Sequence, residues 1–110
     1  MSITNELKLK KVEILIFNSK ILFYRGEFND FQNLVAKEGF DISFEEDNSD
    51  GLSFDFEGYQ LIWVAQNAPK HVVIHECLHA VLNICTSRGI DRNDDEVLCY
   101  MLEYLVKNLL

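Results

Sequence analysis

The hydrophobic pattern changes its period within residues 59–89, whose sequence is YQLIWVAQNAPKHVVIHECLHAVLNICTSRG. Residues 59–65 form an apolar and aromatic run, interrupted by a single glutamine, that is typical of a strand. Pro69 suits the first turn of a helix, with Asn67 as a possible cap, and Gly89 suits the position after its end. The stretch therefore predicts a strand followed by a long helix.

The predicted helix has two different sides. Apolar residues at helical spacing share one side: Val73, Cys77, Ala80, Val81 and Ile84. His75 and His79 fall on the other side, where Leu78 and Leu82 flank them. We therefore expect this helix to be buried nearly all round.

The first part of the chain has a strand-rich pattern. Residues 11–17 and 21–24 are both typical of strands, and the short polar break between them predicts a hairpin. A short helix is expected next, with Asn29 or Asp30 as its cap and Gly39 as its end.

Two alternating segments, 42–44 and 52–56, are further strand candidates that precede 59–65. After Gly89, a last helix is expected to open at Asn93, and its core stripe is Val97, Leu98, Met101, Leu102, Leu105 and Leu109. The order ββαβββαα predicts an α+β fold, in which a small, mostly antiparallel sheet packs on the histidine-bearing helix and on a C-terminal helix.

Composition limits the size and the partners of the protein. Residues 1–110 are 48% apolar, which suits one domain with one core. No apolar run reaches the length of a membrane span, and residues 1–11 lack the apolar stretch of a secretion signal, so we expect a cytoplasmic protein. A formal net charge of −8 would repel a phosphate backbone. We therefore expect neither membrane nor nucleic acid as a partner.

The three cysteines, Cys77, Cys85 and Cys99, all fall in apolar helical patterns. Their odd number and placement predict buried, reduced thiols rather than disulfides. Cys77 follows Glu76 directly and points away from the histidine side of the helix, so we do not expect it to bind a metal.

Residues 75–79, His-Glu-Cys-Leu-His, form an H-E-x-x-H sequence. The spacing of four puts His75 and His79 on one face of a helix, where both can hold a single ion, and Glu76 can reach a water beside it. In the alternative interpretation, the histidines only form hydrogen bonds in a partly buried helix and Glu76 reaches solvent. The position of the motif, on a predicted helix directly after a strand, favours zinc binding.

A catalytic zinc typically has three protein ligands, so the two histidines need a third. The start of the last predicted helix offers carboxylates, of which Glu96 is our choice, with Asp95 and Glu103 as alternatives. Glu96 also has a structural interpretation, because Asn93-x-x-Glu96 has the form of a capping box.

Two further residues are candidates near this site. His71 extends the four-residue histidine spacing and is either an oxyanion donor or an exposed first-turn residue. Tyr100, one turn after Glu96, is either a group that polarises a substrate carbonyl or a core aromatic with a satisfied hydroxyl.

With these residues the chain resembles the gluzincin group of zinc metallopeptidases, particularly its minimal single-domain members. The resemblance is carried by HECLHAV at 75–81 and NDDEVLCY at 93–100. It also looks like small metallopeptidases encoded by tailed bacteriophages, in which H-E-x-x-H-A is followed by acidic residues and E-x-x-x-Y. The match covers 58–110, and the first half is similar only in its strand-rich pattern.

The resemblance implies hydrolysis of a peptide bond. Zn²⁺ would be held by His75, His79 and Glu96. Glu76 would take the proton of the attacking water and deliver it to the leaving amine. The strand at 59–65 would form the sheet edge on which an extended peptide or protein substrate docks. Larger members build much of the cleft from a second domain. Here the site would be shallow, a protein partner would complete it, or the protein would cleave only one dedicated substrate.

Two other functions stay open from the sequence. The first is a non-catalytic, zinc-binding interaction protein, such as a phage-encoded factor that binds a host protein in the host cytoplasm. It shares the ligands of the peptidase and differs in the role of Glu76. The second is a structural domain without a metal.

Overall fold

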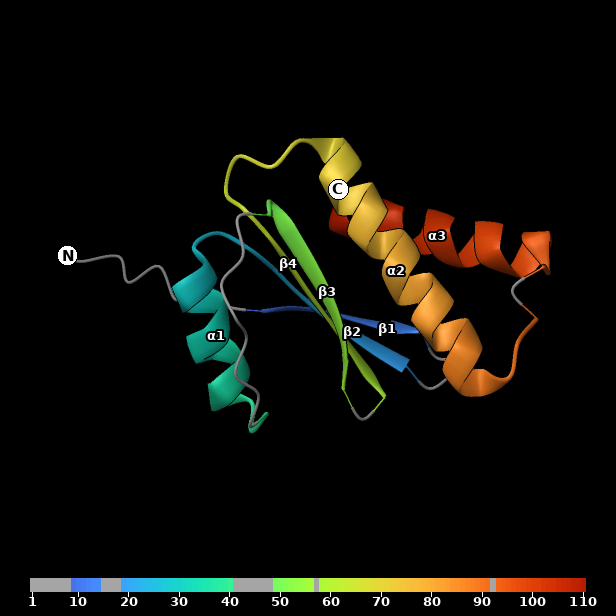
Figure 1. The fold of residues 1–110 in the computed structure, drawn as a ribbon, viewed down its shortest axis with the longest axis horizontal. Helices are drawn as coiled ribbons and strands as arrows, with labels where there is room; N and C mark the ends of the chain where they lie inside the picture. The colour runs from blue at the N-terminus through green and yellow to red at the C-terminus, as the bar shows by residue number, and fades with distance from the viewer. Residues whose placement is uncertain (1–8, 15–18, 41–48, 57, 92) are drawn as a thin grey trace.

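The structure is a computed structural model and describes residues 9–14, 19–40, 49–56, 58–91 and 93–110. Its elements are β1 (Lys10–Ile14), β2 (Ser19–Arg25), α1 (Phe28–Lys37), β3 (Gly51–Phe56), β4 (Tyr59–Val64), α2 (Lys70–Arg88) and α3 (Asp95–Leu109) (Figure 1). The predicted α+β class is confirmed.

Within the described ranges the strands form one mixed sheet with the order β1-β2-β4-β3. β1 is antiparallel to β2 and β3 is antiparallel to β4, whereas β2 and β4 are parallel. The predicted hairpin of the first two strands is confirmed. The central parallel pair was not predicted. It requires the chain to return to the same end of the sheet after β2, and the segment that contains α1 and β3 makes this crossover.

β3, not β4, forms the edge of the sheet beside α2. β4 pairs with β2 on one side and with β3 on the other, and Leu61, Ile62 and Val64 are fully buried. The expectation that 59–65 forms the edge is therefore wrong. A continuous apolar run suits a strand that is covered on both faces, whereas β3 stays partly exposed along its length.

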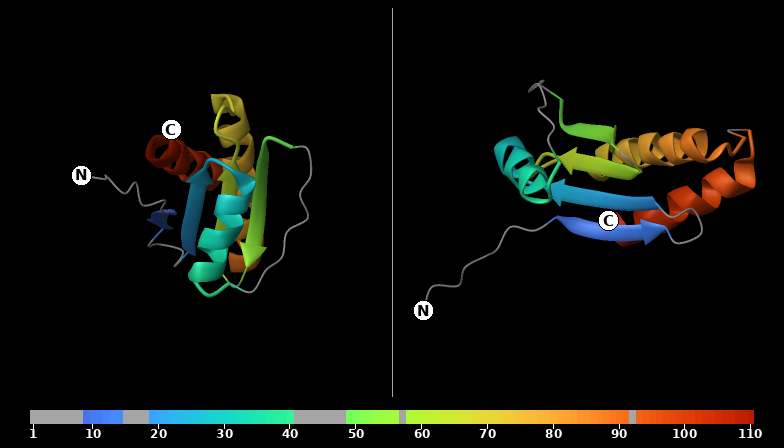
Figure 2. Two further views of the ribbon diagram at one scale, coloured as in Figure 1. Left: turned by 90° about the vertical axis from the view of Figure 1, so that its left-hand side faces the viewer. Right: turned by 90° about the horizontal axis from the view of Figure 1, so that it is seen from below.

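Helices cover both faces of the sheet. α2 and α3 pack on one face, with a core that includes Val12, Ile21, Ile62, Val64, Val73, Ile84, Met101 and Leu105. α1 packs on the other face, with a core that includes Leu22, Tyr24, Phe31, Val35, Leu61 and Trp63. In the left panel of Figure 2, α1 lies in front of the sheet and α2 and α3 lie behind it. Every residue predicted for the core side of α2 is buried.

α1 begins two to three residues earlier than the cap prediction required. Its N-cap is Glu27, without a side-chain hydrogen bond, and not Asn29 or Asp30. The first helical residue, Phe28, packs edge-on against the Trp63 ring, with 5.0 Å between the centroids, so burial rather than capping determines where this helix begins. The predicted strand at 42–44 lies outside the described residues.

α2 follows the prediction closely at both ends. Pro69 is its N-cap, so Asn67 is not, and Gly89 ends the helix in the left-handed conformation with φ of 68°. The guanidinium of Arg25, at the end of β2, donates to the carbonyl oxygen of Ala68 at 2.9 Å, which ties the segment before α2 to the sheet. No helix in the described part of the chain is long and apolar enough to cross a membrane.

Candidate metal centre

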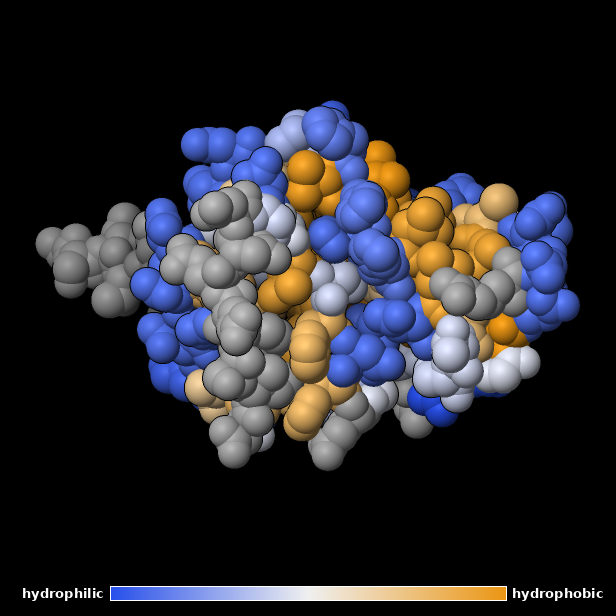
Figure 3. Space-filling model, in the orientation of Figure 1, coloured by the Kyte–Doolittle hydropathy of each residue, from blue (hydrophilic) through white to orange (hydrophobic). Residues whose placement is uncertain are grey.

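α2 exposes one of its sides to solvent. His75 and His79 are exposed, and Ile74 and Leu78 beside them are 39% and 41% exposed. The expectation that the helix is buried all round is therefore wrong, because the sheet covers one side of α2 and α3 covers only part of the remainder. Figure 3 shows hydrophilic residues in a band along α2, with hydrophobic residues beside the band toward α3.

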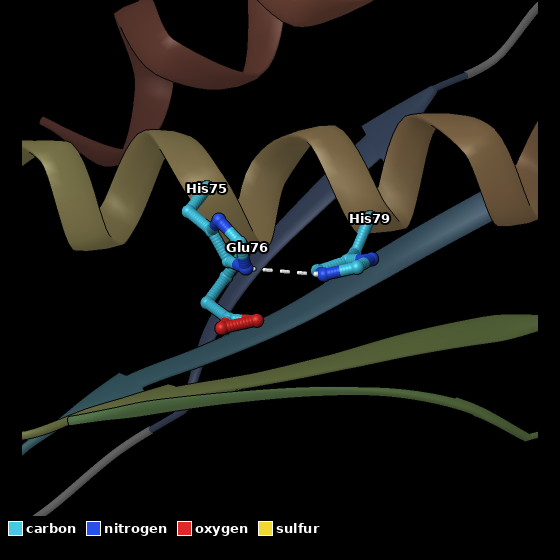
Figure 4. Close-up of side chains that lie close together, drawn as sticks. All are labelled: His75, Glu76 and His79. Carbon is cyan, nitrogen blue, oxygen red and sulfur yellow. Dashed lines mark hydrogen bonds between the residues drawn. The ribbon is translucent and has the colours of Figure 1, made fainter. Parts of the chain in front are cut away.

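The two histidines converge through the same atom of each ring. Their Nε2 atoms are 3.1 Å apart, and the rings lie edge to face with centroids 4.7 Å apart (Figure 4). Two nitrogens bound to one tetrahedral zinc at about 2.05 Å are about 3.3 Å apart. The observed separation therefore suits two ligands of one ion. Without an ion, one imidazole N–H can donate to the lone pair of the other ring at this distance.

Glu76 lies beside the histidines but is directed inward. One of its carboxylate oxygens and the ligand nitrogens of His75 and His79 lie within 4.8 Å of one another. We call these three residues the histidine–glutamate cluster. The cluster projects from α2 on the side of the strands, away from α3 (Figure 4). Only 6% of Glu76 is exposed, so the cluster combines two accessible imidazoles with one buried carboxylate.

A glycine in the edge strand makes room for this carboxylate. A Cβ on Gly51, the first residue of β3, would lie 3.0 Å from Cγ of Glu76 and 3.1 Å from its Oε2. It would also lie 2.9 Å from Cγ1 of Val72, so both helical neighbours would have to shift. The Glu76 side chain therefore occupies space that any larger residue at the start of β3 would fill.

The electrostatics of the helix interior argue against a cysteine ligand. Burial, with a smaller contribution from the Glu76 carboxylate, raises the pKa of Cys77 to about 11. The thiol is fully buried in the main core and stays protonated at neutral pH, whereas metals bind the thiolate. All three cysteines are free, as expected, but Cys99 is exposed, and the expectation of burial is wrong for that residue.

The structure does not bring Glu96 to the cluster. Glu96 is exposed in the first turn of α3, and it is not part of the candidate metal-binding group found among the described residues. The cap of α3 is Asp94, whose carboxylate accepts from the backbone N–H of Val97 at 3.3 Å, so Asn93 is not the cap. α3 starts far from the middle of α2 (Figure 1). The role of Glu96 as a zinc ligand stays a prediction, and the arrangement of α2 and α3 does not support it.

The other candidates also lie outside the cluster. Asp95 and Glu103 are exposed on α3, and His71 is exposed in the first turn of α2. Tyr100 is 69% exposed, so its interpretation as a core aromatic is wrong. A role of Tyr100 toward a substrate stays a prediction.

A buried polar pair, which was not predicted from the sequence, continues the histidine side of α2. Gln60, on β4, is 1% exposed, and its Oε1 accepts from Nδ2 of Asn83 at 3.1 Å. Asn83 lies one helical turn after His79, so polar contacts extend from the cluster toward the end of β3. Gln60 within the apolar run of 59–65 was the signal in the sequence, since a buried amide needs a partner.

We expect Asn83→Ala to lower the free energy of unfolding by about 1–3 kcal/mol, because the Gln60 amide stays buried and loses its partner. Urea denaturation followed by circular dichroism measures this change. The double variant Gln60→Leu/Asn83→Leu removes both polar groups. Its free energy of unfolding is expected to be closer to that of the wild type. A double variant less stable than Asn83→Ala would contradict this account of the pair.

Comparisons of the chain with protein-family models, with curated proteins and with solved structures found no match. A function can therefore be inferred only from the cluster itself. Two imidazole nitrogens and a nearby carboxylate form a donor set that suits zinc, since zinc binds histidine nitrogen and carboxylate oxygen.

Proposed function

We propose that the protein is a zinc-dependent peptidase in which His75 and His79 hold the ion and Glu76 is the general base. The single observation that carries this proposal is the histidine–glutamate cluster, with its Nε2 atoms 3.1 Å apart beside a carboxylate that is only 6% exposed. When bound, zinc supplies a Lewis acid that polarises a carbonyl and makes water easier to deprotonate.

The place of Glu76 within the H-E-x-x-H sequence favours a base over a third ligand. One of its carboxylate oxygens lies within 4.8 Å of both histidine nitrogens, so Glu76 can reach a water beside an ion that these nitrogens hold. Glu76 would then take the proton of this water as the water oxygen attacks the carbonyl carbon, and would deliver the proton to the leaving amine.

The position of β3 at the edge of the described sheet supports an extended peptide as the substrate. In the described part of the chain β3 pairs only with β4, and its first residue, Gly51, adjoins Glu76. A peptide that adds to this edge as a further strand would gain main-chain hydrogen bonds and pass beside the cluster. In the proposed zincin-type arrangement, residues 51–56 therefore take the docking role that the sequence analysis gave to 59–65.

A second candidate function is zinc-dependent protein binding without turnover. It is favoured by the exposure of Ile74 and Leu78 beside the histidines, because exposed apolar side chains that gather on one face mark interaction sites. The two functions share His75 and His79, and they differ in whether Glu76 moves a proton.

Incubation of the zinc-loaded protein with a mixed peptide library, followed by mass spectrometry, tests the proposed function. New termini are expected with zinc, are expected to disappear when a chelator removes the ion, and are expected to return when zinc is restored. Peptides that remain intact at full zinc occupancy would contradict the peptidase proposal and favour the second function.

A further inference from the structure

The side of α2 that faces away from β3 carries a row of exposed apolar residues. Glu76 marks the side toward β3, because it adjoins Gly51. Ile74 and Leu78 each lie two residues from Glu76, which is about half a turn around the helix. Both are exposed, and Leu82, which is partly exposed, continues the row at the same four-residue spacing. Since α2 contacts β3 on one side and α3 on the other, this row faces α3.

α3 presents a matching row to α2. The hydroxyl of Tyr104 donates to the carbonyl oxygen of Glu13 in β1 at 3.0 Å, so this side of α3 faces β1. Leu102 and Val106 lie two residues before and after Tyr104, about half a turn around the helix, and Leu98 continues their row. All three are partly exposed. Because β1 lies on one side of α3 and α2 on the other, the row of leucines and valine faces α2.

The two rows together form one apolar surface. We call it the α2–α3 seam, and its residues are Ile74, Leu78, Leu82, Leu98, Leu102 and Val106. Figure 3 shows hydrophobic residues between the hydrophilic band along α2 and hydrophilic residues near the start of α3. Apolar side chains that are exposed singly need no explanation, but a group of them on one face marks an interaction site.

The shape of the seam favours a helix as its occupant. Rows with a spacing of four residues are the ridges against which another helix packs. An amphipathic helix carries its apolar residues at a similar spacing and can lay them along two such rows. The seam therefore suits a third helix on the outside of α2 and α3.

Carboxylates flank the seam on α3. Asp95, Cys99 and Glu103 each precede a seam residue by three, so they form the next row on the helix surface, and all three are exposed. On α2 the next row consists of the three histidines of the chain. Neither of these two rows contains lysine or arginine, and the chain has a formal net charge of −8. Complementary charge therefore favours an occupant with lysine and arginine beside its apolar face, and like charge disfavours a second copy of this chain.

We propose that the α2–α3 seam binds a cationic amphipathic helix of a partner protein. The apolar residues of this helix would lie along the seam, and its lysine and arginine side chains would lie beside Asp95 and Glu103. The inference goes beyond the proposed function and does not rest on it. The seam lies on the side of α2 away from Glu76, and binding there requires neither zinc nor hydrolysis.

A synthetic helical peptide with leucine on one face and lysine on the other is the probe. Isothermal titration calorimetry of the full chain without zinc should detect its binding. The same peptide with glutamate in place of lysine should bind about tenfold more weakly. Ile74→Ser/Leu78→Ser should weaken binding of the lysine peptide by more than about tenfold, because it removes two apolar side chains that the peptide buries. Glu103→Lys should weaken it by about fivefold.

Tyr100→Ser is the matched control. Tyr100 is also a large exposed residue of α3, but it lies one turn before Tyr104 on the side toward β1, so its loss should leave the affinity unchanged. Alkylation of Cys99 is a second measurement that locates the peptide. Cys99 is exposed beside the seam, whereas Cys77 and Cys85 are buried, so bound peptide should slow the reaction of this one thiol.

Weaker binding of the lysine peptide in Ile74→Ser/Leu78→Ser and in Glu103→Lys, with slower alkylation of Cys99 in the wild type, supports the inference. Absence of binding, an unchanged affinity in the double variant, or equal affinity for the glutamate peptide would overturn it. A wild-type dimer that the double variant dissociates, measured by analytical ultracentrifugation, would show a second copy on the seam and would also overturn it. If the double variant unfolds, Glu103→Lys and the alkylation of Cys99 decide. All these measurements omit zinc, so they are independent of whether the protein hydrolyses peptides.

Discussion

Zinc affinity is expected to fall more than a hundredfold in His75→Ala and in His79→Ala. Each substitution removes one of two Nε2 atoms that face each other at 3.1 Å and leaves a single imidazole that cannot chelate. Loss of a group that only orients a ligand costs about 10–100-fold, and loss of the ligand itself should cost more. Isothermal titration calorimetry, or competition with a coloured chelator, measures the dissociation constant.

His71→Ala is the control for these variants. His71 is the same residue type on the same helix, lies one turn before His75, is exposed, and is outside the cluster. Its loss should leave the affinity unchanged. An equal loss in His71→Ala would contradict the assignment, because zinc would then be binding to any exposed histidine of α2.

The zinc affinity of Glu96→Ala, measured together with that of the histidine variants, tests whether Glu96 is the third ligand. Glu96 lies outside the cluster, so the structure predicts an affinity at the wild-type value. A loss as large as that of the histidine variants would show that the first turn of α3 reaches the ion in the zinc-bound protein. The sequence-based ligand set would then be correct and the metal-free arrangement would differ from the bound one.

The helices and their core sides were predictable from the sequence because they depend on local spacing. Apolar residues at helical intervals share one side of α2. The helix ends at Gly89, as predicted, and this glycine has the left-handed conformation. The arrangement of the strands was not predictable in this way. Whether β4 lies inside the sheet or at its edge depends on pairing with β2, which is distant in the chain, and the pattern of one strand does not identify its neighbours.

The same distinction applies to the candidate site. The convergence of His75 and His79 follows from their spacing of four residues on one helix. The burial of Glu76 depends on Gly51, which belongs to another element, β3. The distance between Glu96 and the histidine–glutamate cluster depends on how α3 crosses α2.

Glu76→Gln is expected to lower peptide hydrolysis by about 10²–10⁴-fold while zinc binding and the fold persist. Glutamine has nearly the shape of glutamate and fits the space over Gly51, but its amide cannot accept a proton from water. The turnover number of the zinc-loaded variant, measured on a peptide that the wild type cleaves, tests this expectation.

Glu103→Gln is the matched control, because it makes the same chemical change at an exposed position of α3 outside the cluster, and it should leave hydrolysis unchanged. Hydrolysis at the wild-type rate in Glu76→Gln would exclude Glu76 as the base. Loss of zinc from Glu76→Gln would instead make Glu76 a ligand. The melting temperature of the metal-free variant separates this result from unfolding, because it reports on the fold without zinc.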